Sequence, residues 1–186
     1  MAVDPIDLNY TRQYNMGSIQ RTVYYADLNL DIDADNFPNL PNLQSAQNFT
    51  DLAVIDSDIP LKDGRRWKEL YVTEDTGAVR SEMVGEMDGK SFEHYLDFFY
   101  PGNKEEALSF AAYINNGHFL FIAKDAEGKM RLVGNPQFPA QVDSNELTTG
   151  QSTSDRKGMT VTVKAKGNSP APIYKGNLIL TAGSGS

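Results

Sequence analysis

An Asp-Gly dipeptide between two alternating runs is the feature that most restricts how this chain can fold. Asp88-Gly89 separates residues 78–87 from residues 90–100, and apolar and polar side chains alternate in both runs. Asp-Gly favours the two-residue type I′ hairpin turn, because both central residues of that turn need a positive φ. The sequence therefore predicts a long antiparallel hairpin in which Met87 lies opposite Lys90.

This register divides the side chains of the hairpin between two faces of a sheet. The first face carries Arg80, Glu82, Val84, Glu86, Ser91, Glu93, Tyr95 and Asp97, and the second carries Ser81, Met83, Phe92, His94, Leu96 and Phe98. We expect the second, mostly apolar face to pack in the core. The first face has four carboxylates and one arginine, and we expect it to be solvent-exposed. This solvent-exposed face is either an ordinary protein surface or the wall of a pore for a polyanion. An acidic wall would suit such a pore, because like charge prevents adhesion.

Short β-type segments recur along the rest of the chain, and one helix interrupts them. Strands are predicted over residues 20–30, 67–73, 118–124, 129–134, 138–142 and 159–164, and residues 172–180 close the fold. A helix is predicted over residues 104–115, where Asn103 and Glu106 form a capping-box pattern and Asn115-Asn116-Gly117 ends the helix. The fold class predicted from this pattern is mainly β, a β-sandwich or barrel with long hairpins and one flanking α-helix.

A length of 186 residues fits one domain with additional segments. We predict an N-terminal arm over residues 1–18, one β-rich domain over residues 19–180, and a flexible linker or expression remnant over residues 181–186. Two long polar loops, residues 31–66 with a short strand near 52–55 and residues 144–157, are predicted inside the domain. We expect residues 36–66 and 144–157 to be mobile in an isolated subunit and ordered in the assembly, since they carry few candidate core residues.

The composition excludes several classes of function. The chain has no cysteine, which excludes disulfides, thiolate catalysis and Cys-based metal sites. Its net charge of −8 argues against a protein that grips nucleic acid, but is compatible with one that lets nucleic acid pass without sticking. Neither an apolar run long enough to span a bilayer nor the pattern of a secretory signal is found, so we expect no membrane association.

Two short motifs are similar to ligand-binding loops, and we interpret both as structure. Asp31-Ile32-Asp33-Ala34-Asp35 has the spacing that opens an EF-hand loop, but Asn36 and Asn42 replace its glycine and its bidentate glutamate. Residues 85–91 are similar to a phosphate-binding loop, but an alternating run follows them where a helix is needed. The chain has two histidines and no catalytic constellation, so we expect no enzyme activity, cofactor or metal.

A series of turn and strand motifs extends over residues 67–176. In chain order it comprises Gly89-Lys90-Ser91-Phe92-Glu93, Phe99-Tyr100-Pro101-Gly102-Asn103, the helix, His118-Phe119-Leu120-Phe121-Ile122, Arg131-Leu132-Val133-Gly134, Phe138-Pro139-Ala140, Thr148-Thr149-Gly150, Asp155-Arg156-Lys157-Gly158 and Ala171-Pro172-Ile173-Tyr174. This series resembles structural proteins of tailed bacteriophages, especially those that infect Bacteroides-like hosts. The order of elements is similar to the tail tube fold, which contractile injection systems share.

The resemblance implies a tail tube subunit, which forms stacked hexameric rings around a lumen that conducts DNA during ejection. It implies that Arg80, Glu82, Glu86, Glu93 and Asp97 face the lumen, and that Tyr25, Trp67 and Phe99 contact neighbouring subunits. The implied partners are further copies of the chain, other phage tail and connector proteins, and DNA that passes without adhering. The implied location is the virion tail, after assembly in the host cytoplasm.

Two alternatives remain open on the sequence. A head–tail connector or other virion ring protein would stop at a single ring, whereas a tube subunit stacks along the axis. A monomeric β-sandwich binding module would bind a ligand through residues 36–66 or 144–157 and would stay monomeric at all concentrations.

Overall fold

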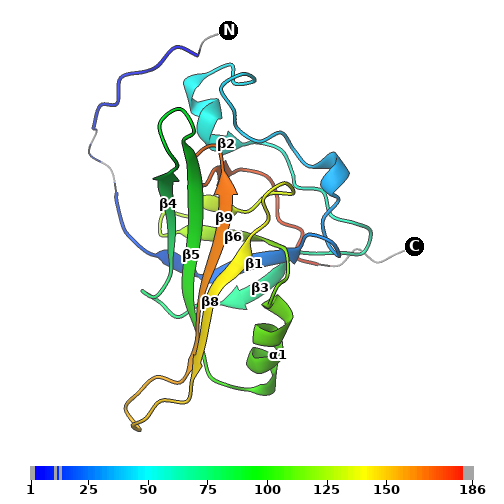
Figure 1. Cartoon of the computed structure of the whole chain (residues 1–186), viewed down its shortest axis with the longest axis vertical. Helices are drawn as coiled ribbons and strands as arrows, with labels where there is room; N and C mark the ends of the chain where they lie inside the picture. The colour runs from blue at the N-terminus through cyan, green and yellow to red at the C-terminus, as the bar shows by residue number, and fades with distance from the viewer. Residues whose placement is uncertain (1–2, 11, 13, 182–186) are drawn as a thin grey trace.

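The computed structural model describes residues 3–10, 12 and 14–181. Over these residues the chain is mainly β, with two sheets and one α-helix, which confirms the predicted fold class at this level (Figure 1). No helix in this part of the chain is long and apolar enough to cross a membrane.

The two sheets differ in size and in the order of their strands. The six-stranded sheet has the order β2-β10-β7-β6-β1-β3, formed by β1 (Ile19–Asp27), β2 (Val54–Ile55), β3 (Lys68–Tyr71), β6 (Phe119–Asp125), β7 (Met130–Val133) and β10 (Ile173–Tyr174). The four-stranded sheet has the order β4-β5-β9-β8, formed by β4 (Ala78–Val84), β5 (Ser91–Pro101), β8 (Gln141–Thr148) and β9 (Gly158–Gly167). The remaining elements are the α-helix α1 (Glu105–Ile114) and the 3-10 helices η1 (Ala34–Asn36) and η2 (Phe49–Ala53).

Two apolar clusters hold these layers together, one on each face of the six-stranded sheet. The first lies between the sheets and includes Val23 of β1, Phe121 of β6, Leu96 of β5 and Val161 of β9. The second lies on the opposite face and includes Trp67, Ile122, Tyr174, Ile32 and Ile59. The six-stranded sheet is therefore covered on both sides, and the four-stranded sheet on one side.

The hairpin predicted over residues 78–100 is present, but its register differs by two residues from the prediction. Arg80 lies opposite Tyr95, and residues 85–90 connect the two strands in a loop longer than the predicted two-residue turn. A type I′ turn needs a positive φ at both central residues, and of Asp88 and Gly89 only Asp88 has one, 62°. Gly85, with a φ of 100°, opens the wider loop. A shift of two residues leaves every strand side chain on its predicted face.

The predicted loop over residues 144–157 is wrong in its first part. Residues 144–148 belong to β8, which pairs with β9, and only residues 149–157 form the exposed connection between them. The strand predicted over residues 138–142 starts later, at Gln141, because a turn precedes it. In that turn the side-chain oxygen of Asn135 accepts hydrogen bonds from the amides of Gln137 and Phe138, at 3.0 and 2.9 Å.

Residues 31–66 are not the sparsely anchored loop that the sequence suggested. Ile32, Ile55 and Ile59 are buried in this segment, and Ile32 forms an isolated antiparallel bridge with Leu61. The amide of Ile59 donates a hydrogen bond to the hydroxyl of Tyr174 at 3.0 Å, which ties the segment to β10. The segment covers the outer side of the six-stranded sheet, so its apolar residues serve as core.

The predicted helix is confirmed, but the predicted capping box is wrong. α1 starts at Glu105 with Lys104 as its N-cap, and Lys104 makes no side-chain capping bond. The Asn103 side chain instead donates to the backbone oxygen of Thr148 at 2.8 Å, which ties the start of the helix to β8. The first strand also ends earlier than predicted, at Asp27, whose carboxylate accepts hydrogen bonds from the amides of Asn29 and Leu30.

Candidate functional site

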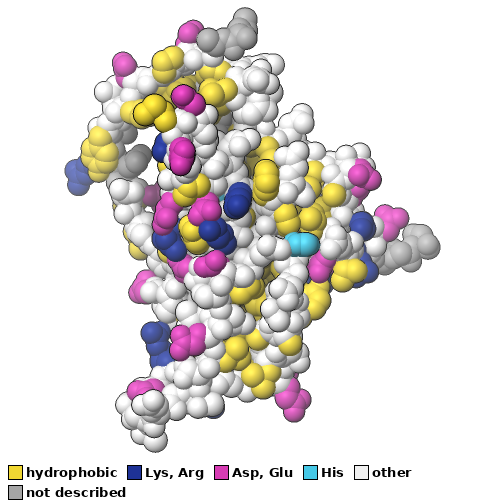
Figure 2. All heavy atoms as spheres, viewed as in Figure 1, with side chains coloured by type: hydrophobic (Ala, Val, Ile, Leu, Met, Phe, Trp, Pro, Cys, Tyr) yellow, Lys and Arg dark blue, Asp and Glu magenta, His cyan; other side chains and the backbone are white. Residues whose placement is uncertain are grey.

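The four-stranded sheet has one face that no other part of the described chain covers with a core. We call this the outer face, and its central charged and aromatic residues are Arg80, Glu82, Glu93, Tyr95, Asp97, Lys164 and Lys166. They share a face because Tyr95 lies opposite both Arg80 and Lys164, and Glu93 lies opposite both Glu82 and Lys166. Over β4 and β5, on the surface turned toward the viewer, acidic and basic side chains are intermingled (Figure 2).

Arg80 joins two carboxylates of the outer face. Its Nε donates to Asp97 at 2.9 Å and its Nη1 donates to Glu82 at 2.7 Å. The hydroxyl of Thr162 donates to the other Asp97 oxygen at 2.8 Å, so both oxygens of Asp97 have partners. The guanidinium carbon lies 4.6 Å from the centre of the Tyr95 ring, within the range of a cation–π interaction.

A second group of contacts surrounds Glu93. Lys164 Nζ and the Tyr95 hydroxyl both donate to the same Glu93 oxygen, at 2.9 and 2.8 Å. These two hydrogen bonds, that of Lys164 first, lower the pKa of Glu93 below its usual value, because they favour the ionised carboxylate. Lys164 also lies over the Tyr95 ring, opposite Arg80, so that cations flank the ring on both sides.

The outer face carries more positive charge than the hairpin alone indicated. The prediction counted only β4 and β5, where carboxylates outnumber Arg80, but β9 adds Lys164 and Lys166 to the same face. Over β4, β5 and β9, three basic residues, Arg80, Lys164 and Lys166, stand among three acidic ones, Glu82, Glu93 and Asp97, and β8 adds Glu146, which lies opposite Thr160. Glu86, the fourth predicted carboxylate, lies in the exposed loop 85–90 beyond the end of the strand. The central face is thus a mixed surface on which Arg80 and Lys164 are ion-paired.

Both edges of the four-stranded sheet are open within the described residues. β4 pairs only with β5, and β8 pairs only with β9. Beyond the sandwich, the loop 149–157 that joins β8 to β9 projects at the bottom of the molecule (Figure 1). Open edges offer unpaired backbone groups to a further strand, so these two edges are suited to joining copies of the chain.

The three residues predicted to contact neighbouring subunits lie in different environments. Trp67 has no exposed surface and belongs to the second core cluster, so it fills the interior of its own subunit. Tyr25 is partly buried and packs edge to face on Phe110, with ring centres 5.2 Å apart. Phe99 is partly exposed, and the guanidinium of Arg156 from the loop 149–157 lies 5.1 Å from its ring centre. Of the three, Phe99 is the best placed to meet another molecule.

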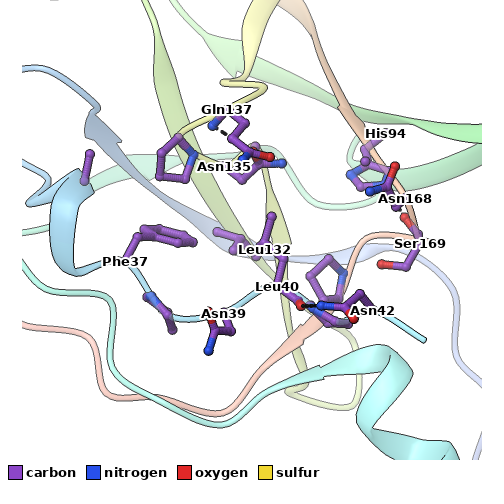
Figure 3. A pocket seen from close by; sticks show the side chains of 17 residues that line it. Phe37, Asn39, Leu40, Asn42, His94, Leu132, Asn135, Gln137, Asn168 and Ser169 are labelled. Atoms are coloured by element: carbon purple, nitrogen blue, oxygen red, sulfur yellow. Dashed lines mark hydrogen bonds between the residues drawn. The ribbon is translucent and has the colours of Figure 1, made fainter. Parts of the chain in front are cut away.

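A hollow of about 370 Å³ lies between residues 37–42, the turn after β7 and residues 167–169 (Figure 3). Phe37, Leu40 and Leu132 form its apolar wall. Much of its polar lining already has partners within the chain. His94 lies 2.7 Å from the backbone oxygen of Ser169, and burial lowers its pKa, while Asn135 holds the turn described above. The hollow brings together no pair of ionisable side chains for acid–base chemistry.

The two motifs weighed in the sequence have structural roles. Asp31 is buried, accepts a hydrogen bond from the amide of Asp27 at 2.9 Å, and forms an ion pair with Lys68. No group of three or more acidic, histidine or cysteine side chains in the described part of the chain could hold a metal ion. Residues 85–90 connect two strands, so no helix follows them to bind a phosphate.

Comparison with known proteins adds no family: no family model, curated protein or solved structure matches this chain.

Proposed function

We propose that this chain is a ring-forming structural protein of a bacteriophage tail, a tube subunit that lines a lumen for DNA. The observation that carries the proposal is the four-stranded sheet, which has a buried inner face, an ion-paired outer face and two open edges. The resemblance of residues 67–176 to phage structural proteins supports the same function.

Ring closure would join β4 of one copy to β8 of the next. Six copies would then form one closed sheet, because each contributes four strands with both edges available. Neighbouring strands lie about 4.8 Å apart, so the closed sheet would be roughly 35–40 Å across before strand tilt widens it. This leaves room along the axis for a DNA duplex, and closure would remove the open edges that favour aggregation.

The outer face would then line the lumen, with Arg80, Glu82, Glu93 and Asp97 on the wall and Glu86 at its rim. The wall would avoid DNA because its arginine and Lys164 are already engaged by carboxylates. A phosphate would have to displace those carboxylates to bind. Pairing of the basic side chains is a different mechanism from repulsion by a purely acidic band. It acts on DNA that touches the wall, at distances shorter than the screening length of about 8 Å.

Assembly tests the proposal directly. We expect concentrated protein to form rings that stack into tubes, visible by negative-stain electron microscopy, and to show large species in sedimentation velocity experiments. Single rings that never stack would favour the connector alternative. A sharp monomer at every concentration, with no rings in assembled tails, would contradict the proposal and favour a monomeric binding module.

A matched pair of variants tests which edge closes the ring. Met83 lies on edge strand β4 with 62% of its side chain exposed, and Met87 lies in the adjacent loop with 88% exposed. Met83→Lys should prevent assembly, because a charge on an edge strand blocks pairing, and should leave the monomer folded. Met87→Lys makes the same chemical change off the edge and should assemble normally. Equal assembly of both variants would remove β4 from the interface.

A further inference from the structure

The N-terminal arm has the side-chain pattern of a β-strand. From residue 6 to residue 16, every even-numbered position is Ile6, Leu8, Tyr10, Arg12, Tyr14 or Met16, and the odd-numbered positions between them are Asp, Asn, Thr, Gln and Asn. In an extended chain successive side chains point to opposite sides, so this pattern collects five large apolar side chains and one arginine on a single side.

The apolar side of the arm is not covered by its own subunit. Its described residues form no helix or strand, and Leu8 and Tyr14 are 86% and 89% exposed. Ser18, with a φ of 74°, turns the chain away from β1, and the arm runs along the β4 side of the molecule (Figure 1). Burial of such side chains releases about 1.5–3 kcal/mol each, so an exposed row of them indicates a partner.

The β3 edge offers a matching acceptor site. β3 pairs only with β1, and Tyr71 on this strand is 49% exposed. Next to it, a hollow of about 360 Å³ opens toward the core between the two sheets, and α1 forms its far wall. Its apolar lining includes Tyr25, Tyr71, Tyr100, Phe110 and Met159.

The arm has two acidic residues, Asp4 and Asp7, and one basic residue, Arg12, and the basic residue is complementary to this edge. Glu69 and Glu106 line the hollow, both are exposed, and neither has an ion-pair partner among the described residues. Arg12 is the one basic residue in the sequence from residue 3 to residue 18, and it lies on the apolar side of the arm. An arm that pairs with β3 would bring this arginine to the acidic rim of the hollow.

We propose that the N-terminal arm of one copy adds as a strand to the free edge of β3 in a second copy. Backbone hydrogen bonds to β3 provide the pairing, and the apolar side of the arm fills the hollow between β3 and α1. The second copy is the partner because the described residues of the arm run along the β4 side of their own subunit and away from α1 (Figure 1). This contact uses the six-stranded sheet, so it does not depend on ring closure through β4 and β8.

Disulfide trapping between full-length chains tests the contact, since the chain has no cysteine of its own. Variants with Leu8→Cys, Tyr10→Cys or Tyr14→Cys in the arm are each mixed with a Phe110→Cys variant, which places its thiol in the hollow, and oxidised. We expect a disulfide-linked heterodimer with at least one arm position. Glu82→Cys on β4 and Glu146→Cys on β8 serve as controls for the other sheet edges. Equal or stronger trapping at these control positions would overturn the proposal.

Two further variants separate a specific contact from random collision. Exchanging two neighbours, Leu8→Asn with Asn9→Leu, keeps the composition but breaks the alternation, and should reduce trapping through Tyr10→Cys several-fold. Arg12→Glu should reduce trapping similarly, and Glu69→Arg with Glu106→Arg in the partner should restore it. An unchanged yield of the disulfide-linked heterodimer in both variants would show that the arm does not bind this site.

Disulfide trapping also tests whether the arm docks on its own subunit, and whether the arm contact depends on ring closure. A chain that carries both Tyr10→Cys and Phe110→Cys would form an internal disulfide in dilute solution if the arm docked on its own subunit, and this would overturn the exchange between copies. Met83→Lys should abolish ring closure but leave the arm disulfide unchanged. Loss of rings with trapping intact therefore refutes only the ring, and rings without trapping refute only the arm contact.

Discussion

The two sheets of this protein differ in how many of their faces are buried. In the six-stranded sheet, β6 has five consecutive buried residues, Phe119–Ala123, because both faces of the strand meet core. In the four-stranded sheet, β5 alternates, with His94, Leu96 and Phe98 buried and the residues between them partly exposed. The first sheet therefore stabilises the subunit, and the second has a face and two edges available for other molecules.

A substitution in the core cluster on the outer side of the six-stranded sheet should give the largest effect. Trp67→Ala removes a fully buried side chain from the second core cluster and should lower the free energy of unfolding by about 3–5 kcal/mol. Tyr95→Ala, the aromatic control on the outer face, should cost about 1 kcal/mol or less, the scale of its cation–π contacts. Urea denaturation of the isolated subunit measures both. Similar decreases in the free energy of unfolding would mean that the two sites contribute equally to the stability of the subunit.

Hydrogen exchange should separate the two long connections in the isolated subunit. The amides of Asp33, Ile59 and Lys62 bond to acceptors inside the 31–66 segment or on β10, so they should exchange slowly. Residues 149–157 are exposed and should exchange orders of magnitude faster. Assembly should slow only the second group. Fast amide exchange in both segments of the free subunit would support the sequence-based prediction that both are mobile loops.

Charge reversal on the outer face should affect DNA passage while leaving the fold intact. Glu82→Lys, Glu86→Lys and Glu93→Lys combined should slow DNA ejection several-fold, because lysines on the wall bind phosphate, and high salt should relieve the defect. Of the three, Glu93→Lys should contribute most, because it also releases Lys164 from its carboxylate partner. Ejection assays on assembled particles measure this. A normal rate at low salt would show that the outer face does not contact DNA.

Acidification should give the smallest effect, through a residue on the buried side of the same sheet. Burial lowers the pKa of His94 in the folded state, against a smaller opposing contribution from its bond to Ser169. The folded chain therefore binds fewer protons than the unfolded chain, and this stability is present above the ordinary histidine pKa and lost as pH falls below it. The melting temperature should fall modestly between pH 7 and pH 5, and less so in His94→Gln. Identical pH profiles would exclude His94 as the cause.

Local patterns in the sequence predicted the elements well where the signal lay within a few residues. The alternation in residues 90–100 predicted β5 and its two faces, and the break at residues 115–117 predicted the end of α1. The register of the β4–β5 hairpin was missed, because Gly85 opens a six-residue loop and the dipeptide Asp88-Gly89 does not reveal this. The alternation of residues 6–16 is also visible in the sequence, but polar residues separate the apolar ones, and the segment was predicted only as an N-terminal arm.

By itself, the sequence determined which side of β5 is apolar, because the period of a strand is local. It could not determine what lies next to that strand. Tertiary pairing of β9 with β5 brought Lys164 and Lys166 among the carboxylates and changed an acidic face into an ion-paired one. Folding of residues 31–66 over the six-stranded sheet likewise turned an apparent loop into core, and buried Trp67. Charge balance and burial are sums over neighbours far apart in the chain, so only the tertiary structure decided them.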